Sequence, residues 1–110
     1  MSEDTHQRIA ALFQDYRESL PALLLELEQS WATLQKSWDA GVAADFDRKV
    51  HGLAGSAATF DLEEIGAVAR ELEYCFKPVF DMEYDTSHSC WLESSKLFAT
   101  LKELIESCQR

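Results

Sequence analysis

Histidine and cysteine are the residue types in this sequence that most readily carry nucleophilic or metal-binding chemistry. There are three of each: His6, His51 and His88, with Cys75, Cys90 and Cys108. No Cys-x-x-Cys motif occurs, and the pair His88 and Cys90 is by itself a weak indication of a metal site. We therefore predict no metal site and no disulfide framework, and we expect the cysteines to be small, buried or half-buried thiols in a reducing compartment.

Among these residues, His51 lies on a helix with an unusual surface. The predicted helix over 42–60 has a core stripe spaced four, three, four and three residues apart: Phe46, Val50, Leu53, Ala57 and Phe60. At about 100° per residue the stripe spans roughly 80°, and His51 falls roughly 140° from its centre. His51 is therefore predicted to face solvent, where a neutral imidazole offers a ring nitrogen with a free lone pair.

The surface around His51 carries few long side chains. The positions one or two turns away are Ala44, Asp47, Arg48, Ala54, Gly55 and Ala58, and four of these six are Ala or Gly. Gly52 and Gly55 each cost about 1 kcal/mol relative to Ala inside a helix, and small residues let a second protein approach closely. We predict that a partner docks on Ala44, Asp47, Gly52, Ala54, Gly55 and Ala58. Two alternatives stay open. The small residues, Gly55 among them, could pack against another helix of the same domain, or His51 could be a surface histidine that occurs by chance.

The elements that must position His51 are helices, because apolar residues recur with a helical period nearly everywhere. We predict an all-α, up-and-down bundle with a four-helix core and a short extra N-terminal helix. The extra helix begins at Asp4 or Thr5 and carries a stripe of Ile9, Leu12, Phe13 and Tyr16. A second helix begins at Ser19-Leu20-Pro21, since proline is tolerated in a first turn, and ends at Asp39-Ala40-Gly41.

Two more helices follow the one that carries His51. Asp61 is predicted to cap the fourth helix, with Glu64 three residues on, and Lys77-Pro78 to stop it. Residues 80–87 are predicted to form a loop before a fifth helix. The core residues of these two helices are predicted to be Ile65, Val68, Ala69, Leu72 and Phe76, then Trp91, Leu97 or Phe98, Leu101, Leu104 and Ile105. We expect Glu63, Glu64, Glu71 and Glu73 to be caps or a solvated face rather than acid/base pairs.

Length and charge restrict the function. A chain of 110 residues is one domain, over 1–110, and its net charge of -10 argues against nucleic acid and anionic membrane surfaces as partners. Residues 1–7 are polar, and the longest strongly apolar run, over 20–25, is too short to span a bilayer. We therefore expect a cytoplasmic protein. It has no Gly-rich phosphate loop, so we expect no ATP site and no enzyme activity of its own.

The run His51-Gly52-Leu53-Ala54-Gly55-Ser56 resembles the signature of histidine-containing phosphotransfer (HPt) domains, usually His-x-Leu-Lys-Gly-Ser in the third-placed helix of a small α bundle. The resemblance covers about Arg8 to Leu72. After the motif, residues 57–60 and the run 69–73 match the way in which the family continues. It implies a bacterial-type two-component phosphorelay. His51 would accept a phosphoryl group from the aspartyl phosphate of one receiver domain and pass it to the Asp of another.

The resemblance also implies partners and cofactors. The expected partners are response-regulator receiver domains and a hybrid sensor histidine kinase, with this chain a monomer. The chain itself needs no cofactor, because the receiver would bring Mg²⁺ and its own Lys. The HPt-like domain would supply an exposed, oriented nucleophile, since phosphoryl transfer depends mainly on positioning and charge neutralisation.

Two positions depart from the family pattern. Ala54 stands where the family usually has a Lys, three residues after the histidine, and this removes a cation from beside the phosphoryl group. Arg48, one turn before His51, could replace that Lys. Arg48 could instead be a surface residue paired with Asp or Glu. Asp61 stands where Gly is common after the helix, and we interpret it as a helix cap. Ser56 could orient the His51 ring or hydrogen-bond back to its own helix. The alternative function is a docking module that binds receiver or kinase domains without being phosphorylated.

Overall fold

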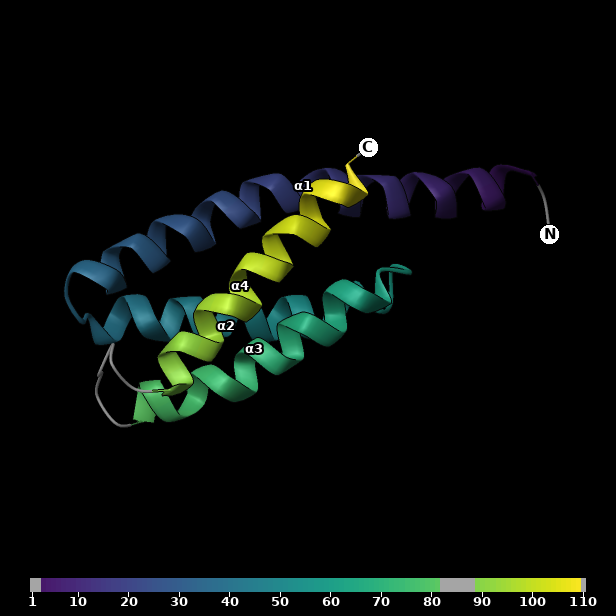
Figure 1. Cartoon of the computed structure of the whole chain (residues 1–110). Helices are drawn as coiled ribbons and strands as arrows, with labels where there is room; N and C mark the ends of the chain where they lie inside the picture. The colour runs from purple at the N-terminus through teal and green to yellow at the C-terminus, as the bar shows by residue number, and fades with distance from the viewer. Residues whose placement is uncertain (1–2, 82–88, 110) are drawn as a thin grey trace.

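Four helices form an antiparallel bundle in the computed structural model, which describes residues 3–81 and 89–109 (Figure 1). They are α1 (Glu3–Lys36), α2 (Ala40–Ala57), α3 (Glu63–Asp81) and α4 (Ser89–Cys108). Each helix packs on the next in the chain, and α4 packs back on α1 to close the bundle. The predicted all-α, up-and-down bundle is confirmed, but the extra N-terminal helix is not a separate element.

Helix α1 runs through the predicted break at Ser19-Leu20-Pro21 without interruption, so that prediction is wrong. A proline inside a helix cannot donate a hydrogen bond to the carbonyl four residues earlier, which here is that of Arg17. The side chain of Gln109, from the end of α4, donates to this carbonyl instead, with Nε2 2.7 Å from the oxygen. A contact from 92 residues away thus occupies the acceptor that Pro21 leaves without its usual partner.

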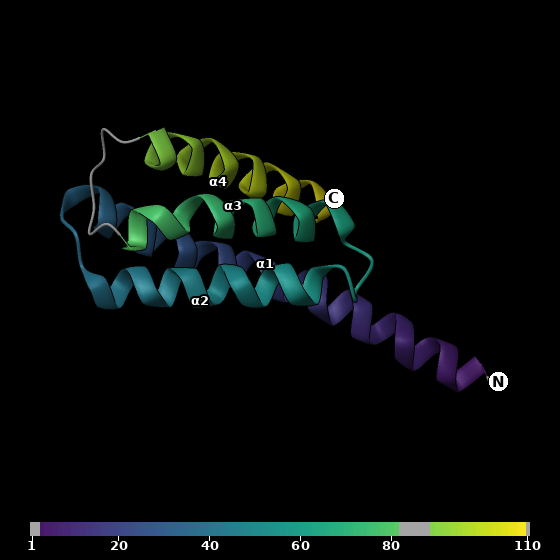
Figure 2. The ribbon, with the colours of Figure 1, turned by 90° about the horizontal axis from the view of Figure 1, so that it is seen from below.

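The N-terminal part of α1 extends beyond the bundle, as Figure 2 shows. A helix of 34 residues is about 51 Å long, close to the longest dimension of the molecule, 54 Å. Of the predicted stripe, Ile9 and Leu12 remain exposed. Tyr16 stacks on Phe60 with ring centroids 4.2 Å apart, and Phe13 meets Phe60 edge-on. These aromatic contacts tie α1 to the residues that follow α2.

The start of α2 is set by Asp39. Its backbone is extended, and its carboxylate accepts a hydrogen bond from the Val42 amide at 3.1 Å, as an N-cap does. Asp39 therefore begins this helix, whereas the sequence suggested that Asp39-Ala40-Gly41 ends the preceding one. That helix already ends at Lys36, and Gly41 lies within α2 without a positive φ.

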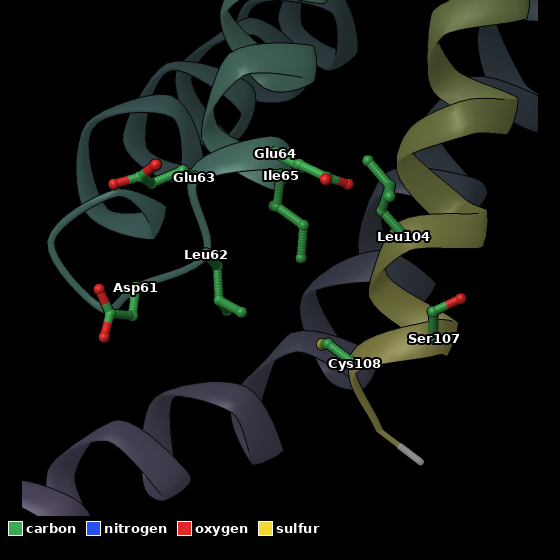
Figure 3. Close-up of a pocket in the computed structure, with 8 residues that line it drawn as sticks. All are labelled: Asp61, Leu62, Glu63, Glu64, Ile65, Leu104, Ser107 and Cys108. Carbon is green, nitrogen blue, oxygen red and sulfur yellow. The ribbon is translucent and has the colours of Figure 1, made fainter.

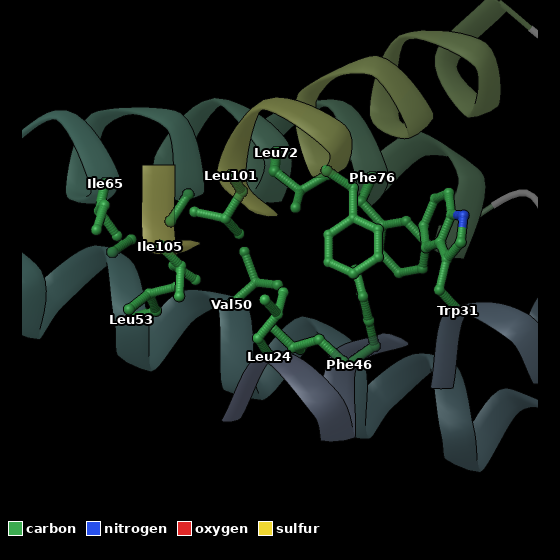
Figure 4. Packing of buried hydrophobic residues seen from close by; sticks show 14 of the residues in the cluster. Leu24, Trp31, Phe46, Val50, Leu53, Ile65, Leu72, Phe76, Leu101 and Ile105 are labelled. Atoms are coloured by element: carbon green, nitrogen blue, oxygen red, sulfur yellow. The ribbon is translucent and has the colours of Figure 1, made fainter. Parts of the chain in front are cut away.

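The buried core is aliphatic around the middle of α2 and aromatic where α1 ends and α4 begins (Figure 4). Trp31 stacks on Trp91 with centroids 4.5 Å apart and lies 5.3 Å from Phe46. Four of the five predicted α2 core residues are buried: Phe46, Val50, Leu53 and Ala57. Phe60 is half-buried and lies beyond the helix, which is shorter than the predicted 42–60. With one face of α2 locked into this core, its opposite face is held toward solvent.

The turn between α2 and α3 ends α2 with a left-handed residue. Asp61 has φ 65°, its amide donates to Ala58 O at 3.2 Å, and the Leu62 amide donates to Ala57 O at 2.9 Å. This is the Schellman pattern, in which Gly is favoured at the left-handed position. The prediction that Asp61 caps the following helix is therefore wrong. Asp61 and Leu62 also line a surface groove of about 590 Å³ that reaches Cys108 (Figure 3).

Helix α3 continues past Lys77-Pro78 to Asp81, so the predicted stop is also wrong. Pro78 cannot donate a hydrogen bond to the carbonyl of Tyr74, four residues earlier, but it lies in the last turn and only three residues of the helix follow it. Of the loop predicted over 80–87, Phe80 and Asp81 are helical, and the rest lies outside the described residues.

Candidate functional site

His51 lies in the middle of α2 with a side chain that is 74 % exposed, as its position on the helical wheel predicted. Its neighbours Val50 and Leu53 are buried in the core and fix the rotation of the helix. The imidazole is therefore presented at the surface of the molecule. The groove described above and a second one along His6, Ile9, Ala10, Phe13 and Arg17 do not include it.

Glu73 from α3 hydrogen-bonds to the imidazole: its Oε2 contacts Nδ1 of His51. A carboxylate is an acceptor, so in the neutral ring the proton lies on Nδ1 and the lone pair on Nε2. The Glu73 side chain is only 27 % exposed, which restricts its movement. The contact therefore selects one tautomer and leaves Nε2 free to react.

Sequence reasoning missed Glu73, which it placed in a solvated face. The residue follows the buried Leu72 and lies four positions after the buried Ala69, at the edge of the core stripe of α3. An acidic residue at such an edge faces the neighbouring helix, and this position was the signal in the sequence that could have identified Glu73. Which residue of that helix it meets depends on the register between α2 and α3.

Small exposed residues surround His51 as predicted. Ala44, Gly52, Gly55 and Ala58 are exposed, and Asp47 is half-buried at the margin. A Cβ atom added at Gly52 or Gly55 would meet nothing within 4 Å. Packing inside the domain therefore does not account for either glycine, and the surface over Gly52 and Gly55 is open to a partner.

Ala54 does not belong to this surface, and its assignment to the docking face is corrected. It is only 4 % exposed because α3 lies directly over it. A Cβ atom added at Gly66 would lie 3.5 Å from Ala54 O and 3.4 Å from Ala58 N. The backbones of α2 and α3 approach each other closely here, and Ala54 is part of the internal contact.

Arg48 is exposed one turn before His51, and its guanidinium pairs with the carboxylate of Asp45. Lys49 donates to the same carboxylate at 2.8 Å, and this hydrogen bond holds the pKa of Asp45 below its ordinary value. Lys49 also reaches Glu26 of α1 at 3.1 Å, and the two carboxylates raise the pKa of the Lys49 ammonium. Arg48 thus belongs to a surface cluster on the far side from Glu73.

Ser56 adopts the structural role that the sequence left open. Its hydroxyl donates to the Gly52 carbonyl at 2.9 Å, so the Tyr16 hydroxyl, 2.6 Å away, must donate to Ser56. Ser56 thereby joins α1 to α2, and neither of these bonds involves the His51 ring.

In the described part of the chain, the remaining candidate residues form no second site. Cys75, Cys90 and Cys108 are half-buried and form no disulfide within the described residues, and burial raises the pKa of the Cys75 thiol. Among residues 3–81 and 89–109, no group of three or more His, Cys, Asp or Glu could hold a metal ion. His88 lies outside those ranges. None of the helices so described is both long and apolar enough to cross a membrane.

The site can therefore act as an exposed nitrogen nucleophile with a fixed tautomer, on a surface that admits another protein. The family model of the Hpt domain matches residues 11–109, nearly the whole chain. Neither a curated protein nor a solved structure matches the chain.

Proposed function

Because the chain belongs to the Hpt domain family, a family of phosphotransfer modules in two-component phosphorelays, we propose that His51 accepts a phosphoryl group from the aspartyl phosphate of one receiver domain and passes it to the Asp of another. The observation that carries this proposal is the contact between Nδ1 of His51 and Glu73. It leaves Nε2 as the nucleophile on an exposed surface.

The proposed transfer is a displacement at phosphorus. The lone pair of Nε2 forms the N–P bond as the bond between phosphorus and the aspartyl oxygen breaks, and the electron pair of that bond leaves on the receiver's carboxylate. The imidazole, which keeps its proton on Nδ1, becomes a cationic N-phosphoimidazole. Glu73 accepts the hydrogen bond from this proton and offsets the positive charge that develops on the ring. The same steps in reverse deliver the group to a second receiver.

Docking and charge neutralisation are divided between the two proteins. In our proposal a receiver domain approaches over Gly52 and Gly55, where an added Cβ atom would meet nothing within 4 Å. The Mg²⁺ that neutralises the phosphoryl oxygens is the receiver's. We propose that a hybrid sensor histidine kinase feeds the relay, that this chain acts in the cytoplasm, and that it functions as a monomer.

A docking module without phosphate is the second candidate function. It is favoured by the absence of a Lys at position 54, where Ala54 is buried under α3. In that case the face around Gly55 would bind receivers while His51 stayed unmodified.

A panel of phosphorylated receiver domains distinguishes the two functions. We expect an acid-labile, alkali-stable label on the wild type, none on His51→Gln, and full labelling of His6→Gln. His6 is a matched control because it is exposed on the part of α1 that lies outside the bundle. Receiver binding without a label on the wild type would refute the transfer function and support the docking module.

A further inference from the structure

The surface groove described with the fold lies between the start of α3 and the end of α4 (Figure 3). Its volume of about 590 Å³ is within the range of clefts that hold a ligand. We propose that it docks a basic segment of a partner protein, in which lysine or arginine side chains flank a leucine or a similar apolar side chain. This binding goes beyond the proposed phosphotransfer and does not depend on it.

The floor of the groove is apolar. Leu62 directly precedes α3, Ile65 lies in the first turn of that helix, and Leu104 comes from α4. Ile65 is only 3 % exposed and belongs to the core, whereas Leu62 and Leu104 are half-buried. An apolar side chain of a partner that covered the two leucines would remove further apolar surface from water, which favours binding.

The rim of the groove is acidic. Asp61, Glu63 and Glu64 line it and are exposed, and no Lys or Arg is among the lining residues. Within 3–81 and 89–109, none of these three carboxylates forms an ion pair. A cation that a partner brings to the rim therefore meets carboxylates that no cation of the described chain occupies, and this charge complementarity favours a basic partner.

The three carboxylates do not converge on one point. Figure 3 shows Glu64 directed toward α4, and Glu63 and Asp61 directed away from it. Among the residues that the structure describes, no group of this kind could hold a metal ion. Negative charges spread around an apolar floor match a segment with several cations and an apolar side chain between them, rather than one small ion.

The groove and His51 lie on different sides of α3. Glu73 of α3 faces α2 and meets the imidazole, whereas Ile65 and Leu104 lie between α3 and α4. His51 is not among the residues that line the groove. A partner segment bound in the groove therefore leaves the imidazole accessible, so that both surfaces can be occupied together.

The test uses a fluorescein-labelled synthetic peptide with two leucines between two pairs of lysines, and fluorescence anisotropy measures its affinity. A matched peptide has serines in place of the leucines. We expect the serine peptide to bind about tenfold more weakly, because it cannot cover the apolar floor. In amide NMR spectra, the leucine peptide should shift the signals of residues 61–65 and 104–108 rather than those around His51.

Matched variants separate the groove from the overall charge of -10. Glu63→Gln combined with Glu64→Gln should weaken binding of the leucine peptide about fivefold, the size of two exposed ion pairs, and high salt should weaken binding to the wild type. Glu103→Gln combined with Glu106→Gln removes as much charge from exposed positions outside the groove and should bind like the wild type. Asp61→Gly should weaken binding about twofold. Its thermal midpoint, measured alongside, excludes unfolding as the cause.

Four results would overturn the proposal. Equal weakening in the two double variants would show that overall charge, rather than the groove, attracts the peptide. Equal affinity for the leucine and serine peptides would exclude the apolar floor. Amide shifts centred on His51 would place the peptide on the other face, and no binding to the wild type would exclude a basic partner segment.

Discussion

Replacing Glu73 tests most directly whether its contact with His51 controls the reactivity of the imidazole. Glu73 accepts a hydrogen bond from Nδ1 of His51 and so holds the proton away from Nε2, the nucleophile of the proposed transfer. The variant Glu73→Ala removes both the orientation of the ring and the negative charge. Glu73→Gln keeps an acceptor oxygen at the same place and removes only the charge.

The size of the effect follows from the exposure of the pair. A hydrogen bond to a charged group contributes about 1.5–3 kcal/mol when it is shielded from water. The His51 side chain is 74 % exposed and that of Glu73 27 %, so we take the lower end of this range. About 1.4 kcal/mol corresponds to a tenfold change in rate. We expect Glu73→Ala to slow transfer about tenfold. Glu73→Gln should slow it about twofold, since an exposed charge pair contributes roughly 0.5 kcal/mol.

Rapid-quench measurement of transfer from a phosphorylated receiver gives these rates. The matched control is Glu71→Ala on the same helix, because Glu71 is exposed and lies away from the α2 edge. Receiver affinity and the thermal midpoint are measured for each variant, so that lost docking or lost folding is separated from slower chemistry. A Glu73→Ala protein with the wild-type transfer rate would refute the tautomer argument. Equal losses in the Gln and Ala variants would show that charge, rather than orientation, is the contribution of Glu73.

Three further substitutions test the docking face and the packing. Gly55→Arg should weaken receiver binding more than tenfold in calorimetry without lowering the melting temperature, because its Cβ meets open space; unchanged affinity would remove Gly55 from the docking face. Asp61→Gly should stabilise the fold by about 0.5–1 kcal/mol in urea unfolding, because it relieves a left-handed non-glycine residue, whereas a loss would favour the capping role. Ser94 is fully buried, and its hydroxyl has no hydrogen-bond partner among the described residues. Ser94→Ala should therefore stabilise the fold by about 1 kcal/mol, and a destabilised variant would reveal a partner for this hydroxyl.

Much of the site could be predicted because it depends on a single helix. The stripe of Phe46, Val50 and Leu53 specifies which face of α2 is buried, and His51 then faces solvent wherever the other helices lie. The exposure of Gly52 and Gly55 follows from the same wheel. Ala54 shows where this reasoning ends, since it lies near the boundary between faces and α3 covers it.

The predicted helix boundaries were less accurate, because local preferences were outweighed by distant contacts. Pro21 suggested a helix start, but Gln109 donates to the carbonyl that Pro21 leaves open. Asp61 suggested a cap, but the close approach of Gly66 to α2 requires a tight turn in which Asp61 takes the left-handed position. Neither contact can be inferred from the residues that surround the proline or the aspartate.

The sequence by itself determined the helical class, the exposed histidine and the bare face beside it, because helical periodicity is a local property that neighbouring residues express together. Only the tertiary structure decided that Glu73 meets His51 and that Ala54 is buried. Both facts depend on which helix lies against α2 and at what register. That register is set by the close backbone contact at Gly66 and by packing across the whole core.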